Sequence, residues 1–282
     1  MRIRMHSYHE VVAAAANLCR EANFYIPQNT RALLEQSFQN EESELGKMVL
    51  ERISENAKIA AEEQMPLCQD CGSALVFLEI GEQFRIRGGN VIDAVSEGVR
   101  RGYREGYLRK SMCHPLTRKN TGDNTPAVIH TDIVKGTRLK IIVMPKGGGS
   151  ENMTKLKMLT PSAGKKGIAD FAVQSVVEAD GNPCPPLILG IGIGGGSAER
   201  TMFLSKKALL RATNSAHSNP EIAALESEIL ERVNQTGIGP QGLGGRITAM
   251  ACFIEWEPCH IASLPVAINL LCHSARHAEV RL

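Results

Sequence analysis

The chain has 282 residues, of which 43% are hydrophobic and 22% charged, with a formal net charge of +2. This composition allows a sizeable core, and the interspersed charges give no reason to expect nucleic acid or a membrane as a partner. Eight cysteines in a chain of this length do not resemble a small secreted disulfide scaffold. No apolar run reaches the ~18 residues that a membrane helix needs. We therefore expect a protein of the reducing cytoplasm.

The first 64 residues are predicted to be mainly helical. Apolar residues recur at helical spacing from Val12 to Cys19, in an alanine-rich run that a helix face explains better than a secretory signal. A second helix is expected after Asn29 or Thr30, either of which could cap it. Residues 44–63 carry a further apolar stripe, typical of a third helix.

From residue 65 onward, the pattern predicts a mixture of strands and helices. We find no internal repeat, low-complexity tract or flexible linker. The predicted class is α/β, of a mixed α+β kind, in a single compact unit over 1–282: a helical segment at 1–64 and an α/β body at 65–282. Strands are predicted at 74–81, 126–134, 138–145, 187–193 and within 246–272, with 126–134 and 138–145 paired to each other. Helices are predicted at 90–110, 166–181, 197–212 and 219–237, the last of them capped by Asn219.

Two glycine-rich stretches could bring backbone close to an anion. Residues 190–195 match G-x-G-x-x-G, but no acidic residue follows about 20 positions later to hold a ribose. A tight strand-to-helix turn is therefore favoured there over a nucleotide site. Residues 145–152, "PKGGGSEN", could form a backbone nest for a carboxylate or an ordinary hairpin loop, and the residues do not decide between them.

The stretch "PLCQDCG" contains Cys68 and Cys71, three positions apart. A redox dithiol would need a helix directly after the motif, where the pattern predicts a strand. A zinc site would need a second close pair of ligands, and no compact ferredoxin-like run of cysteines is present. Three other cysteines are expected to be small buried residues, namely Cys19, Cys113 and Cys252.

Two further sets of residues carry possible site chemistry. Arg109 lies in a loop rich in Pro, Asn, Thr and Gly, where a guanidinium could clamp a dicarboxylate, although such charges are more often simply solvated. His260 and His273 each follow a cysteine near the end of the chain. Either histidine could serve a metal or a purely structural hydrogen bond.

Seven segments taken together resemble the class I, iron–sulfur fumarate hydratases, and specifically their α subunit or N-terminal domain. The related iron–sulfur tartrate dehydratases share the framework, but the glycine loops at 145–152 and 242–250 look closer to the fumarases. The segments run in order from 66 to 279: "PLCQDCG", "GDNTPAVIH", "PKGGGSENMTKLKML", "NPCPPLILGIGIGG", "LSKKALLR", "GIGPQGLGG" and "CHIASLPVAINLLCHSARHAE".

The resemblance implies a [4Fe-4S] cluster held by three cysteines, Cys68, Cys184 and Cys272. One iron is then left without a protein ligand and acts as a Lewis acid toward the substrate. Such a hydro-lyase would interconvert fumarate and (S)-malate and would lose activity in air. The same site in relatives could act on L-tartrate or on mesaconate and citramalate, and outside this class a zinc-binding structural module remains an alternative.

The resemblance also assigns the residues around the substrate. Asp70 is implied to transfer the proton, because acid–base work needs a group within hydrogen-bond reach of the reacting atoms. Gln69, Arg109 and the backbone of Gly149 are implied to bind the dicarboxylate.

Two positions depart from the family pattern, which usually has threonine where Cys71 and Cys259 stand. We expect Cys71 to be a harmless small substitution, the alternatives being that it tunes the cluster pocket or shifts substrate preference toward citramalate or tartrate. Single-chain relatives continue past the segment that ends at Glu279, whereas this sequence stops at Leu282. The resemblance therefore implies a separate β subunit, an α2β2 assembly and little activity from the α chain alone.

Overall fold

The computed structural model describes residues 5–212 and 215–282, and its internal contacts divide the chain into two units. Unit 1 comprises Met1–Pro27, Asn56–Gly148 and Arg276–Leu282, and unit 2 comprises Gln28–Glu55 and Gly149–Ala275. The predicted mixed α/β class is confirmed. The single catalytic unit over 1–282 stays a prediction, and the helical segment 1–64 is shared between the two contact units. The sequence shows no linker between the two units, because each unit is assembled from separate segments of the chain.

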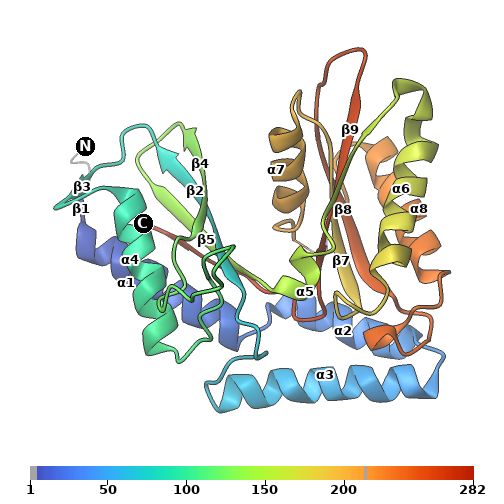
Figure 1. The fold of residues 1–282 in the computed structure, drawn as a ribbon, viewed down its shortest axis with the longest axis horizontal. Helices are drawn as coiled ribbons and strands as arrows, with labels where there is room; N and C mark the ends of the chain where they lie inside the picture. The colour runs from blue at the N-terminus through green and yellow to red at the C-terminus, as the bar shows by residue number, and fades with distance from the viewer. Residues whose placement is uncertain (1–4, 213–214) are drawn as a thin grey trace. The chain divides into compact units, whose positions relative to one another are not determined.

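Unit 1 is built on a four-stranded mixed sheet with strand order β10–β5–β2–β4 (Figure 1). Helix α1 packs against α4 and against β5 and β10, and the apolar residues between them form the core of the unit. The elements are β1 His6–Ser7, α1 Tyr8–Phe24, β2 Ser73–Gly81, β3 Ile86–Arg87, α4 Val91–Glu105, β4 Val128–Val134, β5 Leu139–Lys146 and β10 Ala278–Arg281.

The strand pairing in unit 1 differs from the prediction. Strands β4 and β5 were expected to pair with each other, but β2 lies between them, parallel to β4 and antiparallel to β5. Leu75 of β2 stands opposite Val128 on one side and Met144 on the other. The physical reason is burial: β2 has an almost continuous buried run suited to a central strand, whereas β4 exposes several positions, as an edge strand does.

Local signals account for the ends of the two helices of unit 1. Ser7 and Glu10 form a capping box at the start of α1, and the side chain of Asn90 caps α4. The predicted helix 90–110 ends at Glu105, five residues earlier than expected, since Tyr107 adopts a left-handed backbone conformation with φ of 52°.

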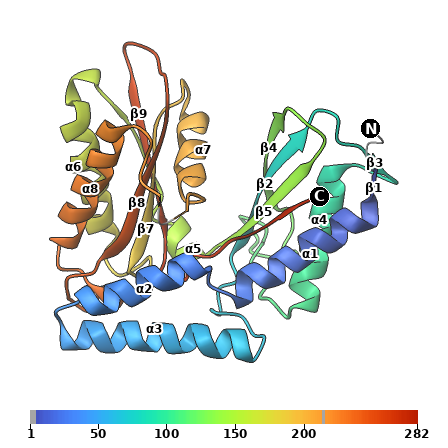
Figure 2. The same cartoon turned by 180° about the vertical axis from the view of Figure 1, so that it is seen from behind.

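Unit 2 contains a second four-stranded mixed sheet, with strand order β6–β9–β7–β8. Helices α6 and α8 cover one face and α7 covers the other (Figures 1 and 2). The elements are α2 Gln28–Asn40, α3 Glu44–Glu62 (whose last residues count with unit 1), α5 Gly148–Glu151 (whose first residue does), β6 Lys155–Leu159, α6 Gly164–Ala179, β7 Leu187–Gly194, α7 Ala198–Ala208, α8 Pro220–Asn234, β8 Ala249–Glu257 and β9 Leu264–Leu271.

Glycines in β7 explain the G-x-G-x-x-G match. A Cβ on Gly190 would lie 2.3 Å from the carbonyl oxygen of Ser205, and one on Gly192 would lie 2.1 Å from that of Thr201. Both carbonyls belong to α7, so these glycines let the helix pack directly on the strand. The predicted strand-to-helix turn is confirmed, and Ser197 caps the helix that follows.

Two more predictions concern helix starts. Asn219 caps α8 as predicted, with its side chain accepting from the N–H of Glu221 at 2.9 Å. Helix α2 begins at Gln28, so the expected caps Asn29 and Thr30 lie inside its first turn. Among the described residues, no helix is long and apolar enough to cross a membrane.

Candidate functional site

The loop before β2 carries the first group of predicted site residues, all in unit 1. Cys68 is half-buried, and its sulfur accepts a hydrogen bond from the backbone N–H of Asp70 at 3.3 Å. The side chain of Gln69 is exposed, with its Oε1 3.3 Å from the Cys68 sulfur. The tight turn therefore places a thiol, an amide and a carboxylate next to one another.

Asp70 is held by backbone groups on both sides of its carboxylate. Its Oδ1 accepts from the N–H of Gly72 at 2.9 Å, and its Oδ2 accepts from the N–H of Gly148 at 2.7 Å. A Cβ on Gly147 would lie only 3.2 Å from Oδ2, which explains why glycine follows β5 here. The stretch 145–152 thus does present backbone N–H to a carboxylate, and in this structure that carboxylate is the protein's own.

Cys71 has a structural role that the sequence did not reveal. Its side chain is only 1% exposed, and its sulfur accepts the backbone N–H of Arg109 at 3.2 Å and donates to the carbonyl of Cys68 at 3.7 Å. Burial raises the pKa of the Cys71 thiol, which keeps it protonated. The position thus holds a small buried side chain that makes two hydrogen bonds.

Asn124 organises the loop that displays Arg109, whose own side chain is exposed. The fully buried Asn124 accepts from the backbone N–H of Ser111 at 2.7 Å and of Met112 at 3.2 Å, and it donates to the carbonyl of Gly72 at 3.1 Å. Its φ of 61° is a conformation that asparagine tolerates. One side chain therefore ties the arginine loop to the loop that carries Cys68.

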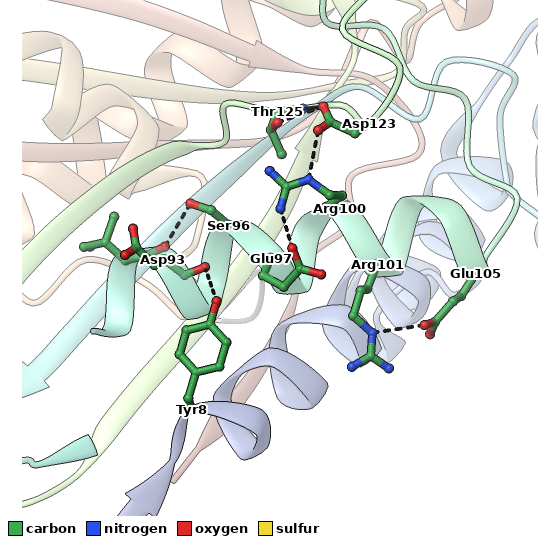
Figure 3. A network of polar contacts seen from close by, with 10 residues as sticks. Tyr8, Asp93, Ser96, Glu97, Arg100, Arg101, Glu105, Asp123 and Thr125 are labelled. Atoms are coloured by element: carbon green, nitrogen blue, oxygen red, sulfur yellow. Dashed lines mark hydrogen bonds and ion pairs between the residues drawn. The ribbon is translucent and has the colours of Figure 1, made fainter. Parts of the chain in front are cut away.

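A second set of contacts anchors this loop to α4 (Figure 3). Arg100 donates to Asp123 at 2.9 Å and pairs with Glu97, while Thr125 donates to Asp123 from both its N–H and its hydroxyl. Burial alone would raise the pKa of Asp123, but these partners hold that pKa at about 2. These contacts anchor the "GDNTP" segment to α4.

Two of the predicted cluster cysteines lie close together in unit 2. The backbone N–H of His273, which follows Cys272, donates to the carbonyl of Cys184 at 3.2 Å, although His273 and Cys184 are 89 residues apart in the sequence. The register of β7 and β9 produces this proximity, since Ile188 stands opposite Leu271 just inside the two loops. Cys184 itself has a left-handed backbone conformation, with φ of 58°.

Gln241 completes this arrangement from the "GIGPQGLGG" segment. Its Nε2 donates to the carbonyl of Pro185 at 2.7 Å and lies 3.0 Å from Nδ1 of His273. Gly149 packs against the same loop, because a Cβ there would lie 2.9 Å from the carbonyl oxygen of Asn182. Sequence reasoning missed Gln241 and left a structural role for His273 open, and only the segment pattern pointed to their vicinity.

The remaining cysteines and His260 have local roles. Cys19 and Cys252 are buried as expected, and burial raises the pKa of the Cys19 thiol to about 12. Cys113 is only half-buried, so that expectation was wrong: it sits in an irregular loop instead of a packed face. Cys259 donates to the carbonyl of Ser263 at 3.2 Å, and His260 accepts a backbone N–H in the same turn.

The donor set suits an iron–sulfur cluster. Cys68, Cys184 and Cys272 form no disulfide, and all three residues are half-buried. Thiolate is the ligand that such clusters use, and hydrogen bonds to sulfur, as seen at Cys68, are common in their sites. Neither unit contains all three cysteines, and within residues 5–212 and 215–282 no group of three or more His, Cys, Asp or Glu side chains is arranged to hold a metal ion.

Unit 1 also contains a cavity of about 970 Å³, and its lining residues differ from the site residues described above. It is lined mainly by one side of α1 and by the last residues of the chain, including Glu10, Glu21 and Arg281. None of the predicted site residues contributes to it.

The chain is similar to known proteins along nearly its whole length. The family model described as fumarate hydratase (fumerase) matches residues 12–281. A Methanocaldococcus jannaschii protein with the provisional name L(+)-tartrate dehydratase subunit alpha is 46% identical over 271 residues, which covers 94% of this chain and 95% of that protein. The L(+)-tartrate dehydratase subunit alpha of Escherichia coli K12 is 30% identical over 281 residues, covering 98% and 92%, and that of Shigella sonnei matches equally.

Proposed function

Because the chain belongs to the fumarate hydratase (fumerase) family of hydro-lyases, we propose that it is the α subunit of an iron–sulfur enzyme that reversibly hydrates fumarate to (S)-malate. The observation that carries the proposal is the meeting of the Cys184 and Cys272 loops through the His273 hydrogen bond. Two cysteines that are far apart in the sequence thereby lie on adjacent loops at one end of a sheet, which supports a common ligand role.

Cys68, Cys184 and Cys272 would hold a [4Fe-4S] cluster. When bound, such a cluster would supply Lewis-acid chemistry at the iron that has no protein ligand. Cys71 is not part of this ligand set, because its thiol is buried and already engaged with Arg109 and Cys68. The reducing cytoplasm is the place of action that we propose.

The other site residues would act on the dicarboxylate. In the dehydration direction Asp70 accepts the proton from C3 of malate, the C–H electron pair forms the double bond, and hydroxide departs from C2. The backbone N–H groups of Gly72 and Gly148 fix the direction of that carboxylate before substrate arrives. Arg109, on its anchored loop, neutralises one substrate carboxylate, and Gln69 and the Gly149 backbone orient it.

L-Tartrate is the second candidate substrate, and the names of the relatives favour it. The glycine loops of this chain favour fumarate instead. Steady-state rates with malate, fumarate, L-tartrate and mesaconate, measured with the same anaerobic preparation, decide between them. A kcat/KM for tartrate above that for malate would replace the fumarase proposal with the tartrate one.

The ligand assignment is tested by iron content. Cys68→Ser, Cys184→Ser and Cys272→Ser should each lose the cluster after anaerobic reconstitution, whereas Cys71→Thr should keep about four irons per chain, as wild type does. Cys113→Ser is the matched control, since Cys113 is also half-buried. Aeration should abolish activity in wild type, and ferrous iron with a thiol should restore it. Iron loss in Cys71→Thr as complete as in Cys68→Ser would contradict the assignment.

A separate β subunit is also proposed, because the relatives are named as α subunits. The assembly expected is α2β2. Without β the site would be open to water, which weakens its electrostatics, so the α chain alone should bind the cluster but show little hydratase activity. Adding the β subunit should raise kcat by orders of magnitude, and full activity from the α chain alone would refute this part of the proposal.

A further inference from the structure

Arg276 is a buried arginine behind the loop that carries Cys68 and Asp70. It is 4% exposed, and its Nη2 donates to the backbone carbonyl of Asp70 at 3.0 Å and to Oδ1 of Asn23 at 3.4 Å. Its Nε is buried without a hydrogen-bond partner. Among the residues that the structure describes, no carboxylate forms an ion pair with this guanidinium.

Such an environment is unfavourable for a group that is always charged. Arginine does not lose its proton in proteins, so it cannot escape the cost of burial by becoming neutral. Buried charges are therefore normally paired with an opposite charge. The hydrogen-bond acceptors of Arg276 in unit 1 are a backbone carbonyl and a side-chain amide, and neither of them carries a charge.

We propose that Arg276 is a positioning residue for the Cys68–Asp70 loop and the internal counter-charge of the anionic group bound there. The inference rests on the proposed function, in which that group is a thiolate-ligated cluster. Through the Asp70 carbonyl, the guanidinium fixes the turn that presents Cys68 and the Asp70 carboxylate together. Through its charge, it stabilises the cluster, and more so the reduced cluster, which carries one additional negative charge.

The two roles are separated by two substitutions in the full chain, reconstituted anaerobically. Arg276→Gln removes the charge and keeps a hydrogen-bond donor, and Arg276→Lys keeps the charge and loses the planar fork. The matched control is Arg211→Gln, because Arg211 is also largely buried but has a carboxylate partner, Glu226. One-electron reduction by dithionite, followed by electron paramagnetic resonance at controlled potential, gives the ratio of reduced to oxidised cluster.

At a fixed applied potential, Arg276→Gln should lower the ratio of reduced to oxidised cluster at least threefold, while Arg276→Lys and Arg211→Gln should leave it within error of wild type. Transfer of iron to a chelator should be several-fold faster in both Arg276 variants, since both loosen the hold on the Asp70 carbonyl. Thermal melts of the iron-free proteins show whether each variant folds. If Arg276→Gln does not fold, Arg276→Lys still tests the charge, because a threefold fall in its ratio would overturn the assignment.

The failure of this inference is distinguishable from that of the proposed function. Wild-type protein that takes up no cluster would refute both the role of Arg276 and the proposed function. Wild-type protein that binds the cluster, beside an Arg276→Gln variant with the same ratio of reduced to oxidised cluster and the same rate of iron loss, would overturn the role of Arg276 and leave the hydro-lyase proposal intact.

Discussion

Replacing Asn124 with alanine should destabilise the protein by about 4 kcal/mol. The side chain is fully buried and makes three hydrogen bonds, to the N–H groups of Ser111 and Met112 and to the carbonyl of Gly72. At a net value of about 1 kcal/mol each, their loss costs about 3 kcal/mol. Alanine at a φ of 61° adds roughly 1 kcal/mol, because its Cβ disfavours the left-handed conformation.

Urea unfolding of the iron-free chain measures this loss as a fall in the transition midpoint at an unchanged slope. Asn124→Gly is the matched control: it loses the same three hydrogen bonds but tolerates the backbone conformation, so it should be roughly 1 kcal/mol less destabilised than the alanine variant. In the assembled enzyme, both variants should raise KM more than they lower kcat, since the loop displays Arg109. A loss below about 1 kcal/mol in Asn124→Ala, or equal losses in the two variants, would refute the reasoning.

Three further outcomes follow from single contacts. Gly98→Ala should lower the melting temperature, because the new Cβ would lie 2.4 Å from that of Ala15 and such overpacking costs about 1–3 kcal/mol, more than alanine gains in helix propensity. The pKa of Asp123 is lowered from its ordinary value of 3.8 to about 2, so the ionised carboxylate stabilises the fold above pH 3.8, and this stabilisation is lost as the pH falls toward 2. The difference in unfolding free energy between wild type and Asp123→Asn should therefore disappear over that pH range, and a difference that stays constant would contradict this prediction. Glu41 is buried, which by itself raises its pKa, but backbone N–H donors lower it further than burial raises it. Glu41→Gln should therefore cost about 1–3 kcal/mol at pH 7 in denaturant unfolding, and less at a pH low enough to protonate wild-type Glu41.

The amino-acid sequence determined most of the long helices and strands, because their signals are local, but it did not mark the short elements β1, β3, α5, β6 and β10. Apolar spacing placed α3, the cap at Asn219 marked the start of α8, and the apolar run at 74–81 marked β2. The segment pattern likewise identified the family, which the match over residues 12–281 confirms. Where a local signal was ambiguous, as at the glycines of 145–152, the sequence left two interpretations open.

Only the tertiary structure decided how these elements meet. That β2 separates β4 from β5, that the Cys184 and Cys272 loops share a hydrogen bond, and that Gly148 donates to Asp70 all depend on residues far apart in the chain. The same is true of the buried Arg276, whose neighbours Asn23 and Asp70 lie more than 200 residues earlier. Strand register and helix packing bring such groups together, and neither can be read from a local pattern, because each is chosen by the burial of whole faces.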